Sequence, residues 1–160
     1  MPSGFDLTNS PAELAARMDT RPVILLSSTG TKVIDRIRDS EHAFIACFRN
    51  FTATIRALWR EGRSVTLIGA GTRGQFREED QMCSAWIAAG LLDQGYIPQD
   101  RSSEELIQKW RNANVQDVLV SESVSYLQRT NQMRDLNFIL SHFDDIDSAF
   151  KVIRNQIMEQ

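Results

Sequence analysis

The sequence has no excess of positive charge, no long apolar run and few cysteines, and each of these shortages excludes a class of protein. Its 160 residues carry 18 Lys and Arg against 21 Asp and Glu, a net charge of −3, which leaves no basic surface for nucleic acid. No apolar stretch approaches the roughly 20 residues that span a bilayer, and the N-terminus lacks the apolar core of a signal peptide. We therefore expect a cytoplasmic protein whose partners include neither nucleic acid nor a membrane.

The two cysteines, Cys47 and Cys83, lie inside apolar segments and lack the spacing of metal ligands. This placement favours buried free thiols in a reducing compartment over a disulfide. The sequence also contains neither G-x-G-x-x-G nor a Walker A lysine, so it carries no nucleotide-binding fingerprint. Its length and its hydrophobic content of 42% predict a single domain over residues 1–160.

Residues 65–80 read as a strand, a glycine-rich turn and the start of a helix. Gly71 and Gly74 can adopt positive φ and let a ligand approach the backbone. The acidic run Glu78, Glu79 and Asp80 follows, at the position where carboxylates favour a helix N-terminus. These carboxylates have two interpretations: they complement the helix dipole, or they hold a hard cation such as Mg²⁺ beside an anionic ligand.

A second stretch rich in hydroxyl groups lies between a predicted strand, residues 23–26, and a segment with helical spacing from Lys32. Its members are Ser27, Ser28, Thr29, Gly30 and Thr31. Hydroxyl donors, exposed amides and the positive end of a helix can together bind an anion. The same residues are also common in turns and helix caps, so this stretch alone leaves both interpretations open.

Strands alternate with helices along the first 90 residues. The predicted strands are residues 23–26, 43–48 and 65–70, and Asn50 is expected to cap the helix after the second strand. This alternation predicts an α/β fold, a three-layer α/β/α arrangement with a mainly parallel sheet, and the C-terminal third reads as mostly helical. The carboxyl ends of parallel strands share one edge, so three loops should meet there and form a site for a small anion.

Two further patterns, one near each end of the chain, favour local structure over a binding site. The sequence Ser10-Pro11-Ala12-Glu13 predicts a helix start with a capping box. Near the C-terminus, Asp144, Asp145 and Asp147 could bind a cation, although an acidic cap or a solvated turn is the favoured interpretation.

Four of these stretches together resemble the 2-phosphosulfolactate phosphatase family. The family's Gly-Phe-Asp-x-x-Asn-Ser-Pro is matched by Gly4-Phe5-Asp6-Leu7-Thr8-Asn9-Ser10-Pro11. Its Thr-Thr-Thr-Asn-Gly-Thr resembles Leu26-Ser27-Ser28-Thr29-Gly30-Thr31, and its strand-end asparagine falls on Asn50. Its Ala-Gly-Thr-x-Gly-x-Phe-x-x-Glu/Asp-Asp is matched by Ala70-Gly71-Thr72-Arg73-Gly74-Gln75-Phe76-Arg77-Glu78-Glu79-Asp80. The resemblance covers nearly the whole chain and weakens after Gly90.

The resemblance implies a Mg²⁺-dependent phosphatase that acts on a small anionic, phosphorylated or sulfonated hydroxy acid. It implies that Glu79 and Asp80 bind the metal and, with Asp6, form the catalytic set. The implied substrate-binding residues are Asn9, Ser27, Ser28, Thr29, Gly30, Thr31, Asn50, Gly71, Thr72, Arg73 and Gly74. Among these, Arg73 could pair with a carboxylate, sulfonate or phosphate.

The chain also departs from the family pattern. A typical member begins with a longer N-terminal segment that helps to build the site, Thr29 stands at the position of an asparagine, and Leu26 replaces a threonine. These departures favour an alternative, a non-catalytic or repurposed small-anion-binding or assembly module that has lost part of the metal site. Three strands also make a thin sheet, so we expect an exposed edge covered by an identical copy or by a complementing N-terminal chain.

Overall fold

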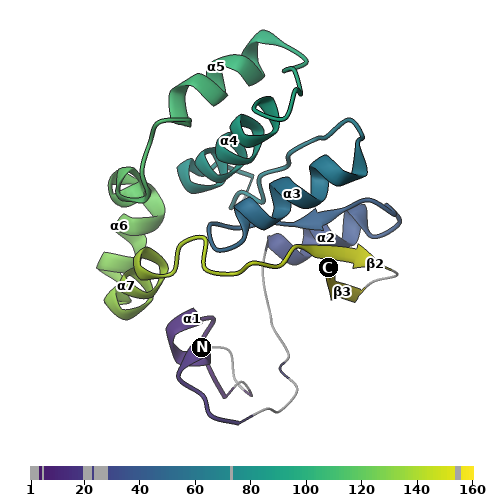
Figure 1. The fold of residues 1–160 in the computed structure, drawn as a ribbon. Coiled ribbons are helices and arrows are strands. Elements are labelled where there is room, and N and C mark those ends of the chain that lie inside the picture. The colour runs from purple at the N-terminus through teal and green to yellow at the C-terminus, as the bar shows by residue number, and fades with distance from the viewer. Residues whose placement is uncertain (1–3, 5, 20–22, 24–28, 73, 154–155) are drawn as a thin grey trace.

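The computed structural model describes residues 4, 6–19, 23, 29–72, 74–153 and 156–160. Helices dominate this part of the chain, and the strands are few and short (Figure 1). The elements in chain order are α1 (Pro11–Ala15), α2 (Gly30–Ile37), β1 (Phe44–Ile45), α3 (Phe51–Glu61), α4 (Glu78–Leu92), α5 (Arg101–Trp110), the 3₁₀ helix η1 (Val115–Val120), α6 (Glu122–Arg129), α7 (Met133–Ser141), β2 (Phe150–Ile153) and β3 (Gln156–Glu159).

The predicted three-layer α/β/α fold with a mainly parallel sheet is wrong. The described strands form one small antiparallel sheet in the order β1-β2-β3, with Phe44 opposite Lys151 and Phe150 opposite Glu159. Residues 65–70, predicted as a strand, form none, and the predicted strand 23–26 lies outside the described residues except for Val23. Strand β2 of the C-terminal hairpin lies beside β1. Next to β1, Val152 N donates to Ala43 O over 2.8 Å.

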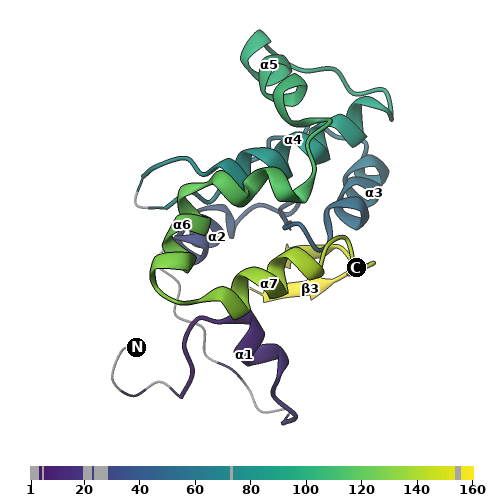
Figure 2. The ribbon, with the colours of Figure 1, turned by 90° about the vertical axis from the view of Figure 1, so that its left-hand side faces the viewer.

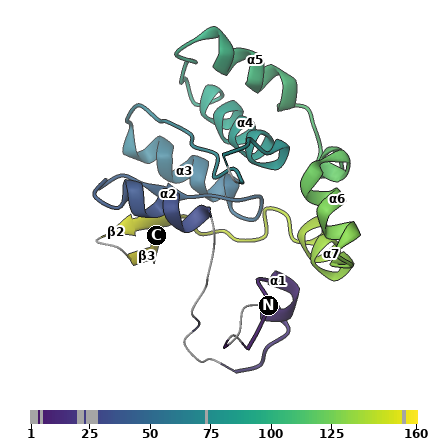
Figure 3. The ribbon, with the colours of Figure 1, turned by 180° about the vertical axis from the view of Figure 1, so that it is seen from behind.

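The core forms where α4 packs between α3 and α5. Met82, Ala85, Ile87 and Leu91 of α4 are buried, and Trp110 at the end of α5 joins them. Figure 3 shows α3, α4 and α5 stacked in succession. Gly90 allows α3 to approach α4, since a Cβ at this position would lie 2.5 Å from Ile55 Cδ1. Helix α4 is therefore held on two sides, which fixes the position of its N-terminus.

The C-terminal aspartates are structural, as the sequence indicated. Asp145 forms a two-pronged ion pair with Arg49 at 2.7 and 2.8 Å, and this hydrogen-bonded pairing holds the pKa of Asp145 below its ordinary value. Asp144 Oδ1 accepts from Thr52 N over 3.2 Å in the first turn of α3, and Asp147 pairs with Arg56. These contacts hold the segment before β2 against α3 and the turn that precedes it.

Helix α1 begins as predicted and packs on α7 (Figure 2). Ser10 caps it by accepting from Glu13 N over 3.0 Å, while Glu13 accepts from Thr8 N and Oγ1 and so does not close the capping box. The buried carboxylate of Asp135 on α7 accepts from Ser10 Oγ and, over 3.1 Å, from Ala12 N. One carboxylate therefore joins the N-terminal segment to the rest of the molecule.

Replacing Asp135 with alanine is expected to lower the free energy of unfolding by about 2 to 3 kcal/mol, because one buried and one half-buried donor lose a charged acceptor. Urea unfolding followed by circular dichroism measures this loss. Asn137→Ala changes an exposed residue of the same helix and should have an effect within about 0.5 kcal/mol. Equal stability of the two variants would show that Asp135 does not hold the N-terminal segment.

Candidate functional site

The glycine-rich segment forms a tight turn that leads into α4. Thr72 N donates to Gln75 O and Gln75 N donates to Thr72 O, each over 3.0 Å. Gly71 has φ +63° and Gly74 has φ +79°, a region that L residues enter at a cost. At Gly71 a Cβ would also lie 2.7 Å from Gln75 O. Two separate constraints therefore require glycine at position 71.

Asp80 ties this turn to the helix. Its Oδ2 accepts from Gly71 N over 2.7 Å, so the carboxylate lies beside the turn. Helix α4 begins at Glu78 and carries all three acidic residues in its first turn, as the sequence predicted. The positive end of the helix favours these negative charges.

Glu79 projects toward α6 and has one unsatisfied oxygen. Its Oε1 accepts from Ser123 Oγ, while its Oε2 is buried and has no hydrogen-bond partner among the described residues. The preceding Arg77 pairs through Nη1 with Glu122 Oε2 at 2.5 Å, and its Nε is likewise buried and unpartnered in the described part of the chain. Buried polar atoms without partners are rare, and a bound ion, water or ligand is one explanation for them.

Sequence reasoning missed Ser123 and Arg77 as parts of this site. Ser123 lies 44 residues from Glu79, in a segment with no motif, so no pattern in the sequence could have joined them. Arg77 did carry a signal in the sequence, because it is a basic residue at the N-cap position, directly before the acidic first turn of α4. It forms no side-chain capping hydrogen bond there.

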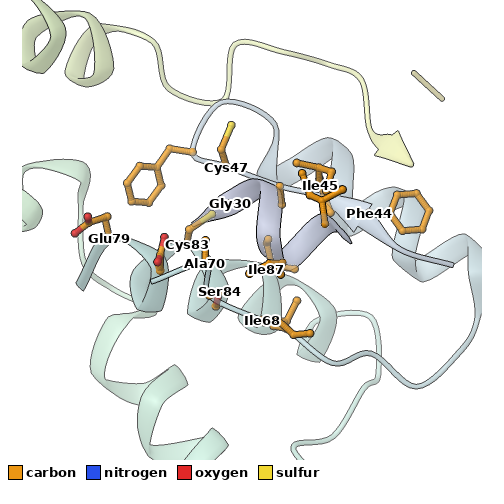
Figure 4. Close-up of a pocket in the computed structure, with 18 of the residues that line it drawn as sticks. Gly30, Phe44, Ile45, Cys47, Ile68, Ala70, Glu79, Cys83, Ser84 and Ile87 are labelled. Carbon is orange, nitrogen blue, oxygen red and sulfur yellow. The ribbon is translucent and has the colours of Figure 1, made fainter. Parts of the chain in front are cut away.

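The carboxylates lie at the edge of a large cavity with a volume of about 870 Å³ (Figure 4). Glu79, Asp80, Ser121 and Ser123 contribute polar groups, and Gly30 brings in the start of α2. Apolar side chains make up most of the remaining wall, including Val33, Ile34 and Ile37 of α2, Phe44 and Ile45 of β1, Leu67 and Ile68, Ile87 of α4, and Leu136, Ile139 and Leu140 of α7. The lining also includes Arg36, His42, Glu61, Arg63, Ser64 and Thr66. The cavity wall is therefore mostly apolar, with polar and charged residues from several segments.

Other predicted site residues lie away from this cavity. Asp6 and Asn9 are exposed on the N-terminal segment, outside the cavity lining. Asn50 is buried and serves the backbone: its Oδ1 accepts from Cys47 N over 2.8 Å, and its Nδ2 donates to Ile45 O over 3.1 Å. A substrate contact by any of these three residues stays a prediction.

The glycine-rich turn and the hydroxyl-rich stretch are only partly described. Gly71 and Thr72 are half-buried and Gly74 is exposed, while Arg73 lies outside the described residues. Ser27 and Ser28 also lie outside them, so the full anion cradle stays a prediction. Thr29 precedes α2 without a side-chain capping bond, and Thr31 is exposed in its first turn. From the predicted set, the described part of the structure places Gly30, Glu79 and Asp80 in the cavity lining and Gly71 in contact with Asp80.

Cys83 is not placed for nucleophilic chemistry. Both cysteines are free; Cys47 is exposed, contrary to the expectation of burial, and Cys83 is half-buried in the cavity wall. Burial, with added repulsion from Cys47 and Asp80, raises the pKa of the Cys83 thiol to about 12. It stays protonated near neutral pH, and the thiolate is the reactive form of cysteine.

Comparison with known protein families identifies the family of this chain. Residues 1–152 match the family model described as 2-phosphosulpholactate phosphatase. The chain belongs to this family. The resemblance drawn from the four sequence motifs is thereby confirmed.

Individual relatives agree with this assignment. A protein of Pseudothermotoga lettingae is 36% identical over 117 residues, which cover 73% of this chain and 49% of the relative. One of Caldanaerobacter subterraneus is 24% identical over 143 residues, 86% of this chain and 59% of the relative. One of Clostridium beijerinckii is 31% identical over 91 residues, 56% and 38%. Each is named "Probable 2-phosphosulfolactate phosphatase", and the matched region spans about two-fifths to three-fifths of each relative.

The described residues of this phosphatase-family chain fit a magnesium ion in part. No group of three or more His, Cys, Asp or Glu side chains gathers among them. Mg²⁺ is, however, commonly held by only one or two carboxylates together with waters and substrate phosphate. Glu79 and Asp80 supply two such carboxylates, and the unpartnered Oε2 of Glu79 suits a cation. In the same part of the chain, no helix is both long and apolar enough to cross a membrane.

Proposed function

We propose that this chain provides the metal-binding and phosphate-binding part of a Mg²⁺-dependent phosphatase for a small, doubly anionic hydroxy acid, of the 2-phosphosulfolactate type named for its relatives. One observation carries the proposal. A buried carboxylate oxygen, Glu79 Oε2, has no partner in the described residues, and both Glu79 and Asp80 line the cavity. Burying such an oxygen costs free energy unless a cation or a hydrogen-bond donor contacts it.

Different residues of the chain would bind the metal and the substrate. Glu79 and Asp80 would hold the ion, which when bound polarises the phosphoryl group and lowers the pKa of water. The Gly71 N–H fixes one oxygen of Asp80 and the Ser123 hydroxyl fixes one oxygen of Glu79, so each carboxylate has a set orientation. Gly30 at the start of α2 lines the same cavity, and the N-terminus of a helix favours an anion.

A binding or assembly module that has lost its chemistry is the second candidate. It is favoured by the lack of a third carboxylate or histidine near Glu79 and Asp80 in the described residues. This candidate keeps the anion site and predicts ligand binding without turnover. A cytoplasmic location and a homo-oligomeric state stay predictions under either candidate.

Release of inorganic phosphate from a panel of phosphorylated hydroxy acids, with and without Mg²⁺, tests the proposal. We expect release only with the metal, and an upward shift of the melting temperature of the protein when Mg²⁺ or Mn²⁺ is added. A metal-dependent shift without phosphate release would favour the binding module. No shift and no release would reject the metal site.

A further inference from the structure

We propose that one end of the cavity is a second anion-binding site, in which Arg36, His42 and Arg63 bind a phosphate, sulfonate or carboxylate group. This end lies away from the carboxylates of Glu79 and Asp80. The contacts and charges found there carry the proposal, and neither depends on the proposed phosphatase activity.

Three segments of the chain meet at this end of the cavity, around the carboxylate of Glu61 at the end of α3. Its Oε2 lies 2.7 Å from Nδ1 of His42, and its Oε1 accepts from Lys151 Nζ of β2 over 2.6 Å. The same ammonium group lies 5.3 Å from the centre of the Phe44 ring in β1. His42, Phe44 and Glu61 all line the cavity. These contacts therefore gather distant parts of the sequence at one end of it.

The contact with Glu61 decides which nitrogen of His42 is left for a ligand. The hydrogen bond from Lys151, with a smaller effect from His42, holds the pKa of Glu61 below its ordinary value. Glu61 is therefore ionised near neutral pH and can only accept, so Nδ1 of His42 donates to it. The other ring nitrogen, Nε2, is left for a ligand, and the protonated ring donates from Nε2 to an anion. The His42 side chain is 38% exposed, so a ligand in the cavity can reach it.

Positive charge is in excess at this end of the cavity. The ion pair just described is neutral, whereas Arg36 in the last turn of α2 and Arg63 just after α3 add two guanidinium groups to the lining. Asp39 and Glu41, between α2 and β1, are exposed and lie outside the lining. Guanidinium groups bind phosphate, sulfonate and carboxylate through charge-assisted hydrogen bonds.

This basic end is separate from the carboxylates of the candidate metal site. Figure 4 shows Phe44 and Glu79 on opposite sides of the cavity. The chain connects the two ends, since Arg63 follows α3, while a Cβ at Gly69 would lie 3.2 Å from Asp80 Cβ. Without a metal, Glu79 and Asp80 repel an anion and the arginines attract it. A free anion should therefore bind at the basic end.

Isothermal titration calorimetry of this chain with inorganic phosphate, in EDTA and at low ionic strength, tests the proposal. Low ionic strength limits the screening of exposed charges, and EDTA removes any metal ion. We expect saturable, one-to-one binding of phosphate. Because neither metal nor substrate is present, the result does not change if the protein proves to have no phosphatase activity.

Charge variants with a matched control locate the site. Arg36→Gln, His42→Gln and Arg63→Gln each remove a charge-assisted hydrogen bond and should weaken phosphate binding about five- to tenfold. Glu61→Gln removes a negative charge and should instead tighten binding at least about threefold. Arg60→Gln makes the same change as Arg63→Gln at an exposed residue of α3 outside the cavity lining, so it should bind like the unaltered chain. Circular dichroism and the melting temperature of each variant establish that it is folded.

Three results would overturn the proposal. The first is that the unaltered chain shows no saturable binding of phosphate. The second is that Arg36→Gln and Arg63→Gln bind phosphate as well as Arg60→Gln does. The third is that folded Glu61→Gln binds phosphate more weakly than the unaltered chain, because the cluster around Glu61 would then not act through its charge.

Discussion

Replacing Asp80 with asparagine is expected to lower Mg²⁺-dependent phosphate release at least about 100-fold and to abolish the Mg²⁺-dependent rise in melting temperature. The asparagine oxygen can still accept from Gly71 N, which donates to Asp80 Oδ2 over 2.7 Å in the unaltered protein. The turn should therefore survive while the negative charge that attracts the metal is lost. Loss of one precisely placed polar group at a reacting centre commonly costs a factor of about 100 to 1,000.

Two comparisons make this result specific to position 80. Asp80→Ala removes both the charge and the hydrogen bond, so it should match Asp80→Asn in activity and fall below it in melting temperature. Asp93→Ala removes a negative charge at the other end of α4, where the residue is exposed, and should leave phosphate release unchanged. The assay uses the same preparation and conditions for each variant as for the unaltered chain. Full activity of Asp80→Asn would remove Asp80 from the metal site.

Replacing Gly71 with alanine is expected to lower the free energy of unfolding by about 2 to 3 kcal/mol and to reduce phosphate release to the level of Asp80→Ala. The left-handed conformation at φ +63° costs an L residue roughly 1 to 2 kcal/mol. The new Cβ would also lie 2.7 Å from Gln75 O, and a backbone oxygen can move away only if the turn opens. Opening the turn withdraws the Gly71 N–H from Asp80.

Gly62 is the matched control for this substitution. It has φ +62° at the end of α3, and nothing lies within 4 Å of a Cβ at this position. Gly62→Ala should therefore show the conformational cost alone, about 1 kcal/mol, and normal activity. Chemical unfolding and the phosphate assay on both variants separate the two effects. If Gly71→Ala and Gly62→Ala behave alike, the contact with Gln75 O does not matter.

The local elements of this protein could be predicted from the sequence because their causes are local. Ser10 and Pro11 start α1, and the acidic run starts α4 at Glu78, since caps and helix dipoles act within a few residues. The motifs that resemble the family are also short stretches of sequence, and they identified the family correctly.

The sheet was predicted wrongly because a strand is defined by its neighbour. Residues 65–70 have the apolar character of a strand, and burial alternates over 65–68, but no described residue pairs with them. Conversely, nothing in the sequence near Phe44 indicates that residues 150–153, more than 100 positions away, lie beside it. Hydrogen bonding between distant segments is decided by the whole fold and not by local preference.

The sequence by itself determined the acidic start of α4 and the glycines that precede it, because charge and conformational freedom belong to the residues themselves. Only the tertiary structure decided how they are used: Asp80 turns to the Gly71 amide, Glu79 turns to Ser123, and one buried oxygen of Glu79 is left unpartnered in the described residues. Orientation and burial depend on contacts between segments distant in sequence, and those contacts exist only once the chain has packed.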